Sequence, residues 1–298
     1  MLVKNNVLLP LDDLIAADPE GKAMMDDFVD STTDVFTIDG NLYELPTDCN
    51  DAVVHVNTKM FQEAGIEIPY DGWTWEEFRS IAKQLTTGEG DSKVYGFGTS
   101  LSPAWLAGWF MSNGSDYIND DWTDSNLSDP KAMETVEFLN SLVNEDKSMP
   151  VPETTTDATS LFAAGRVAMI ATGIWPFPSY KANGFEDVDV VPMPTNSEDA
   201  KVGFGVGGVG IYSKSEHPQE AYDFLEWMTT DEAQAIIADC GMIPSNTDYS
   251  TSDEYIKNHE LEYKIVDFMQ NNYATLVADP NIPQLGDRGD RDSYAAYS

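Results

Sequence analysis

Helix and strand signals alternate along the whole of this 298-residue chain, and this alternation constrains the fold more than any other feature. Thr74 and Glu77 form a capping box that begins a helix whose apolar residues recur at helical spacing. Short apolar runs at 167–171 and 188–193 are typical of buried strands. Such alternation predicts an α/β fold rather than an all-β fold, and the length allows two lobes.

A further helix is predicted to begin at Pro218, because proline is favoured at the first position of a helix. The spacing of its apolar residues predicts that Ala221, Phe224, Leu225 and Met228 point inward. The hydrophobic fraction of 42% is sufficient for a sizeable core behind such helices.

The segment 205–210 reads G-V-G-G-V-G, which matches the G-x-G-x-x-G pattern of dinucleotide-binding turns. In those folds the pattern opens a helix, whereas here it leads into Ile211 and Tyr212, which favour extended backbone. These glycines therefore indicate either a close approach of the backbone to a ligand or a close crossing of two chain segments.

The chain carries 52 acidic residues against 16 lysines and arginines, which gives a formal net charge of −36. A protein this acidic repels phosphate backbones and anionic membrane surfaces, so neither is an expected partner. The charge is compatible with a neutral ligand, or with a protein that works outside the cell or at high salt. It does not choose among these.

No catalytic, metal or cofactor site is predicted. The three histidines are widely separated in sequence, and the chain has no H-E-x-x-H or G-x-S-x-G motif. Its many carboxylates are expected to be solvated surface charges. Cys49 and Cys240 lie outside any C-x-x-C pattern, so they are expected to be buried free thiols, with pairing between them as an alternative.

Aromatic residues make up 11% of the chain, and several lie beside glycine or proline rather than at helical core spacing. Trp105 and Trp109 flank a short Leu-Ala-Gly segment, and Trp175 lies between Gly173 and Pro176. A pyranose has an apolar C–H face that packs on a flat ring, while its hydroxyl groups bond to carboxylates and amides. These tryptophans therefore favour a carbohydrate ligand, whereas Trp75 and Trp227 on helices are expected to be ordinary core or interface residues.

A series of motifs along the chain resembles the family 1 extracellular solute-binding proteins of ABC importers. The motifs occur in the family's order and span most of the sequence. They are L-Y-E-L-P-T-D at 42–48, H-V-N-T-K-M-F-Q-E-A-G at 55–65, W-T-W-E-E-F at 73–78, F-A-A-G-R-V-A-M at 162–169, G-I-W at 173–175, G-G-V-G-I at 207–211 and G-M-I-P-S at 241–245.

The resemblance implies a two-lobed, type II periplasmic-binding-protein-like fold in which the chain crosses between lobes at hinges. The expected first lobe comprises residues 1–48 and 204–245, the second lobe residues 49–203, and a helical segment at 246–298 would brace the two. The family's opening strands, signal peptide and lipid-anchoring cysteine have no counterpart here. The first lobe is therefore expected to be incomplete.

The same resemblance implies a set of ligand contacts. Trp175 matches the tryptophan of the family's G-x-W motif, and Trp105 and Trp109 lie in the segment that supplies aromatics from the second lobe. Hinge residues beside the cleft complete the expected set, which is Tyr43, Asp48, Asn50, Gly207 and Gly208. His55 and Val56 replace the family's usual aromatic pair, so no contact is expected from them.

The function implied by the resemblance is carbohydrate binding and delivery to the membrane permease of an ABC transporter. An oligosaccharide is the expected ligand, because several aromatic platforms indicate several sugar subsites. The protein is expected to be a monomer, either anchored at the cell surface or periplasmic. A secreted glycan-active enzyme is the main alternative, because its cleft would also combine aromatics and acids. The same binding fold with a polyamine or peptide ligand is the second alternative.

Overall fold

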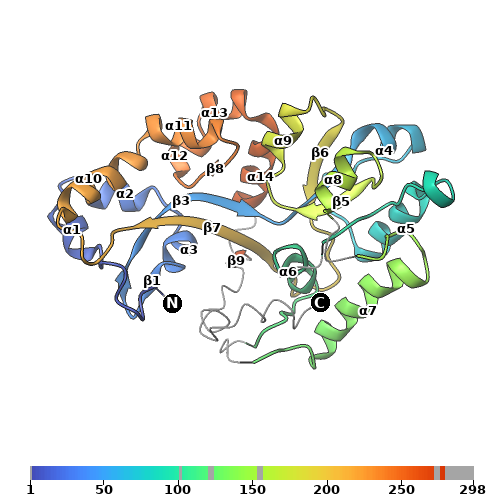
Figure 1. Cartoon of the computed structure of the whole chain (residues 1–298), viewed down its shortest axis with the longest axis horizontal. Coiled ribbons are helices and arrows are strands. Elements are labelled where there is room, and N and C mark those ends of the chain that lie inside the picture. Colours follow the sequence, from blue (N-terminus) through green and yellow to red (C-terminus); the bar gives the residue numbers. More distant parts are fainter. Residues whose placement is uncertain (1, 101–102, 120–123, 153–156, 272–275, 279–298) are drawn as a thin grey trace. The chain divides into compact units, whose positions relative to one another are not determined.

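The computed structural model describes residues 2–100, 103–119, 124–152, 157–271 and 276–278 (Figure 1). The chain divides into two compact units, with crossings at Asp51/Ala52 and Gly203/Phe204. Unit 1 contains the described residues 2–51, 204–271 and 276–278, and unit 2 contains those within 52–203. The first crossing lies three residues after the lobe boundary expected at 48/49. The second coincides with the boundary expected at 203/204.

Unit 1 is built on a four-stranded sheet in the order β8-β3-β7-β9. The long strands β3 (Glu44–Asp51) and β7 (Val202–Gly210) pair antiparallel along most of their length and run side by side in Figure 1. The flanking strands are β8 (Ile243–Pro244) and β9 (Leu276–Ala278). The glycine-rich pattern at 205–210 lies within strand β7 and is not a dinucleotide-binding turn, in line with the expectation that it does not open a helix.

The remaining elements of unit 1 are short helices and one hairpin. They are α1 (Asp12–Ala17), α2 (Gly21–Asp26), α3 (Asp30–Asp34), β1 (Thr37–Ile38), β2 (Asn41–Leu42), α10 (Pro218–Met228), α11 (Asp231–Asp239), α12 (Thr247–Ser250), α13 (Asp253–Asn258) and α14 (Glu260–Asn271). Helix α14 contacts β3 and β8, so the described part of the segment expected to brace both lobes belongs to unit 1.

The core of unit 1 contains Leu11, Leu45, Ile211, Tyr222 and Leu225. Helix α10 begins at Pro218 as predicted and contributes the last two of these residues. The inward orientation predicted for Phe224 is wrong. Its side chain is 55% exposed, because Phe224 lies on the side of α10 that faces away from this core.

Unit 2 is built on a three-stranded sheet in the order β5-β4-β6, in which β4 pairs antiparallel with both neighbours. Its elements are β4 (Val53–Asn57), α4 (Thr58–Ala64), α5 (Trp75–Leu85), a 3-10 turn η1 (Gly90–Ser92), α6 (Pro103–Ser112), α7 (Pro130–Asn144), α8 (Ala158–Ala163), β5 (Met169–Thr172), α9 (Phe177–Ala182) and β6 (Val188–Pro192). The capping box predicted at Thr74 is present, with both of its reciprocal bonds to Glu77.

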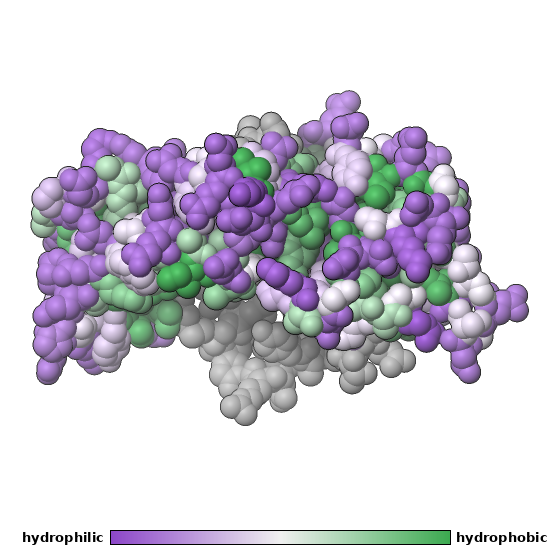
Figure 2. Space-filling model, turned by 90° about the horizontal axis from the view of Figure 1, so that it is seen from above, coloured by the Kyte–Doolittle hydropathy of each residue, from purple (hydrophilic) through white to green (hydrophobic). Residues whose placement is uncertain are grey.

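Hydrophilic residues dominate the face of the molecule shown in Figure 2, where hydrophobic residues form small separate patches. None of the helices in the described ranges has the length and apolar character needed to cross a bilayer. The cysteines Cys49 and Cys240 are both free, so the alternative that they pair is wrong. Cys49 is buried on β3 as expected, whereas Cys240 is exposed just after α11.

Candidate functional site: an exposed tryptophan pair and a glycine-lined strand

Trp175 lies in the short connection between β5 and α9, and its side chain is 46% exposed. The connection is fixed on both sides of the ring. Ile174 is buried before it, and Phe177 is buried in the first turn of α9 after it. An indole held between two buried anchors presents its face to solvent with little loss of side-chain entropy when a ligand packs on it.

Trp105 lies beside Trp175, on the first turns of α6. The two ring centroids are 6.4 Å apart, and the planes are nearly perpendicular at 76°. Helix α6 comes close to the start of β4 because Gly108 has no side chain: a Cβ there would lie 3.0 Å from the Cβ of Ala52. Trp105 is half-buried, so the structure brings together two of the three predicted tryptophans.

Trp109, the third predicted tryptophan, is fully buried. Its ring packs edge-on against Phe78 at 4.9 Å and against Phe97 at 5.3 Å, and it also contacts Trp75. A ring with no exposed surface cannot pack against a ligand, so the ligand contact expected of Trp109 is corrected to a core position. The physical reason is that α6 is covered by aromatic residues of α5 at Trp109 but not at Trp105.

His55 supports the Trp175 connection from within the sheet. It is fully buried on β4, its ring packs 5.0 Å from that of Phe177, and its Nδ1 lies 3.2 Å from the hydroxyl oxygen of Tyr180. Burial lowers the pKa of His55 to about 3, against an opposing interaction with the backbone of Gly173. The imidazole is therefore neutral at physiological pH. This supporting role of His55 and Tyr180 was not predicted, and only their aromatic character hinted at it.

The predicted hinge residues lie on the paired strands of unit 1. Asp48 is opposite Gly207 and Pro46 is opposite Gly208 in the β3–β7 register. A Cβ on Gly207 would lie 2.2 Å from Oδ1 of Asp48, and a Cβ on Gly208 would lie 2.5 Å from the ring of Phe36. The two glycines therefore make room for side chains of the chain itself, which is the close-crossing explanation considered from the sequence.

Asp48 is half-buried, and burial raises the pKa of its carboxyl group. The hydroxyl of Thr47 donates a hydrogen bond to its Oδ1 at 3.0 Å and opposes this shift in pKa. Asn50 lies two residues further along β3, opposite Gly205, and is also half-buried. Tyr43 precedes β3, and its backbone N–H donates to the carbonyl of Phe36 at 3.1 Å. These polar groups could bond to a hydroxyl-rich ligand.

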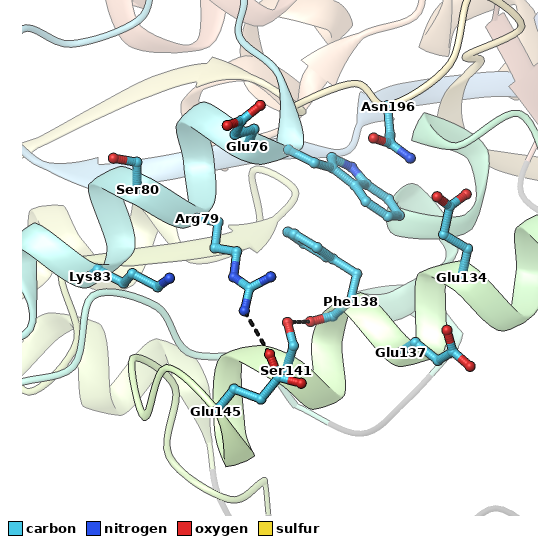
Figure 3. A pocket seen from close by; sticks show the side chains of 11 residues that line it. Glu76, Arg79, Ser80, Lys83, Glu134, Glu137, Phe138, Ser141, Glu145 and Asn196 are labelled. Atoms are coloured by element: carbon cyan, nitrogen blue, oxygen red, sulfur yellow. Dashed lines mark hydrogen bonds and ion pairs between the residues drawn. The ribbon is translucent and has the colours of Figure 1, made fainter.

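A cavity of about 750 Å³ lies in unit 2 between α5 and α7 (Figure 3). Trp75 and Phe138 line it and stack on each other, with ring centroids 4.3 Å apart. Arg79 points across it and bonds to Glu145 at 2.9 Å. None of the predicted site residues lines this cavity, and its charged side chains connect α5 with the end of α7. It is a surface groove between two helices.

The described residues contain no group of three or more His, Cys, Asp or Glu side chains placed to hold a metal ion. The groups that could bind a ligand are therefore aromatic faces, amides and carboxylates. This chemistry suits a polyhydroxylated solute.

The family model of bacterial extracellular solute-binding proteins matches residues 1–262. The chain belongs to this family. Its members bind solutes rather than transform them, so no catalytic residues are assigned. The α/β architecture predicted from the resemblance is confirmed by this match and by the solved structures that share the fold.

Three similar proteins illustrate the relationship. A binding protein of Brucella abortus is 25% identical over 274 residues, which covers 87% of this chain and 63% of that protein. An arabinooligosaccharide-binding protein of Bacillus subtilis is 23% identical over 265 residues, which covers 83% of this chain and 57% of that protein. The structure of a Listeria monocytogenes ABC substrate-binding protein in complex with cycloalternan has a TM-score of 0.82 at 22% identity, and covers 99% of this chain and 77% of that one. This chain thus spans about three fifths of the curated relatives it matches.

Proposed function

We propose that this protein binds an extracellular carbohydrate and delivers it to the permease of an ABC importer. The observation that carries the proposal is the exposed ring of Trp175, which lies 6.4 Å from the ring of Trp105, centroid to centroid. An exposed indole offers an apolar surface on which the C–H face of a sugar ring can pack. Similarity to proteins named for arabinooligosaccharide and cycloalternan supports the same class of ligand.

The proposed contacts are of two kinds. In unit 2, Trp175 and Trp105 are proposed as a stacking surface. In unit 1, taken by itself, Asp48, Asn50 and Tyr43 are proposed as polar groups for sugar hydroxyls. Gly207 and Gly208 are left out of the proposed contacts, because the space over each is occupied by Asp48 or Phe36. An oligosaccharide is proposed over a monosaccharide, because two rings at a large angle present two separate faces.

The chemistry of the ligand also follows from charge. A carbohydrate is neutral, so a chain of net charge −36 neither repels it nor depends on salt to hold it. A polyamine would instead be attracted by the same charge, and its binding would weaken steeply as salt increases. Salt dependence therefore distinguishes the proposed ligand from the cationic alternative.

Calorimetric titration of the full chain with neutral oligosaccharides, putrescine and short peptides tests the proposal. We expect binding to at least one oligosaccharide, with a dissociation constant that changes little with salt. Trp175→Ala should weaken that binding about tenfold, or about 1.4 kcal/mol, because the stacking surface is lost. Trp227→Ala, which removes an exposed tryptophan from unit 1, is the matched control and should bind like the parent.

Two results would overturn the proposal. One is binding of putrescine or a peptide with no response to any sugar. The other is a Trp175→Ala variant that binds the identified sugar as tightly as the parent, which would remove the stacking role of this residue.

A further inference from the structure

Helix α10 in unit 1 leaves two aromatic side chains in solvent. Phe224 is 55% exposed and Trp227 is 39% exposed, although Tyr222 and Leu225 on the same helix are buried. The two exposed rings stack on each other, with centroids 5.7 Å apart and planes inclined by 26°. Neither belongs to the hydrophobic core of unit 1, so packing within this unit does not account for them.

Carboxylates lie next to the aromatic pair in the sequence of α10. Glu220 and Asp223 are exposed on α10, and Glu226 lies half-buried between the two rings in sequence. Burial raises the pKa of Glu226, and the negative charges of Asp18, Asp223 and Glu20 raise it further. These four carboxylates are therefore close enough to interact electrostatically.

These carboxylates have little cationic compensation within the chain. Among the described residues, no lysine or arginine forms an ion pair with Asp18, Asp223 or Glu226; Lys22 pairs with Asp26 and Lys131 with Asp199. The hydroxyl of Tyr222 donates to Asp18 at 3.0 Å, and the amide of Gln219 donates to Asp223 at 2.9 Å. His217 lies 3.5 Å from Glu220 at the start of the helix. The surface thus combines a rigid aromatic pair with unneutralised negative charge.

The charge selects among the partners that could cover this surface. A second copy of the chain would bring the same carboxylates to the same place, and an anionic lipid surface would be repelled. A basic protein segment would be attracted. Arginine is favoured over lysine, because its planar guanidinium stacks on an indole and bonds to a carboxylate at the same time.

We infer that the outer face of α10, formed by Phe224 and Trp227 with Asp223 and Glu226, is a docking surface for an arginine-bearing segment of a partner protein. Tryptophan and arginine are the side chains that most often dominate interface energies, and the surrounding charge would speed association. The inference rests on this surface alone and is independent of the solute that the protein binds.

The test uses the full chain and three short fluorescent peptides. The peptides have the same apolar residues and differ only in carrying arginine, lysine or glutamate. Fluorescence anisotropy should show the tightest binding for the arginine peptide and none for the glutamate peptide. Phe224→Ser/Trp227→Ser and Asp223→Asn/Glu226→Gln should each weaken arginine-peptide binding about tenfold or more, which corresponds to about 1.4 kcal/mol. Trp227→Phe should retain most of the affinity, since a stacking face remains.

Glu63→Gln/Glu67→Gln is the matched control, because it removes two exposed negative charges from unit 2. It should leave peptide binding unchanged. Since the substituted aromatics are exposed, the thermal midpoint should stay close to that of the parent. If the aromatic variant fails to fold, the isosteric Asp223→Asn/Glu226→Gln variant decides alone.

The inference is overturned if the arginine peptide does not bind, if the glutamate peptide binds equally well, or if the control variant loses as much affinity as the α10 variants. It is also overturned if sedimentation shows that the parent chain dimerises and the aromatic variant does not. That result would assign the surface to a second copy. Carbohydrate binding measured on the same variants should be unaffected.

Discussion

At the scale of single residues, neighbours decide what an aromatic side chain does. Trp105 and Trp109 are four residues apart and therefore lie on the same side of α6. Trp109 meets Phe78 and Phe97 and is fully buried, whereas Trp105 meets Trp175 and stays partly exposed. Both residues lie on the same side of the helix, so only their packing partners separate a core residue from a partly exposed one.

His55 gives a prediction at this scale. Its pKa of about 3 in the folded protein lies below the value of about 6.5 expected for the unfolded chain. Below about pH 6.5 the unfolded state therefore binds a proton that the folded state does not, and the free energy of unfolding should fall by up to about 1.4 kcal/mol per pH unit. Above about pH 6.5 both states hold a neutral His55, so this histidine no longer lowers the free energy of unfolding.

Chemical denaturation between about pH 6.5 and about pH 4.5 measures this slope. In His55→Gln the slope should be smaller, whatever the stability of the variant at neutral pH. His217→Gln, at a histidine whose side chain is 75% exposed, is the control and should keep the parent's slope. An unchanged slope in His55→Gln would show that this histidine does not govern acid stability.

At the scale of elements, ion pairs connect helices that do not follow one another in sequence. Asp146, just after α7, has a side chain that is only 6% exposed and pairs with Arg79 and Lys83 on α5. Burial alone would raise the pKa of Asp146, but hydrogen bonds from Arg79 and Lys83 hold it below its usual value. This arrangement fixes the end of α7 against α5.

Asp146→Asn should therefore destabilise the protein by about 1–3 kcal/mol, because the charge-assisted bonds weaken while both cations remain. Asp26→Asn is the matched control. Asp26 pairs with Lys22 one turn away on α2, and both side chains are well exposed, so its loss should leave stability unchanged. Equal effects of the two substitutions in denaturant titrations would contradict the role assigned to Asp146.

At the scale of the whole molecule, the net charge of −36 is the dominant property. Self-repulsion between carboxylates destabilises a compact chain, and mobile ions screen that repulsion. The thermal midpoint should therefore increase as salt is raised, with most of the increase between about 0.01 M and about 0.15 M, where the screening length falls most steeply.

A midpoint that changes only at molar salt would instead point to preferential exclusion of ions from the protein surface. Sucrose at matched osmolality is the control and should not reproduce the increase at low salt. A midpoint that falls with added salt would show that attractive ion pairs outweigh repulsion, against the expectation from the composition.

The sequence by itself determined the fold class and the family, because helix caps, strand runs and ordered motifs are local signals. It also placed the helix starts at Thr74 and Pro218 within a residue or two. Extended backbone was expected at Ile211 and Tyr212, whereas strand β7 runs from Val202 to Gly210. What it could not determine was exposure. Phe224 at a predicted inward position faces solvent, and Trp109 at a predicted ligand position is buried. Exposure depends on which other element covers a side chain, and residues distant in sequence supply that cover. Only the tertiary structure could therefore separate the Trp105–Trp175 pair from the core and reveal the aromatic pair on α10.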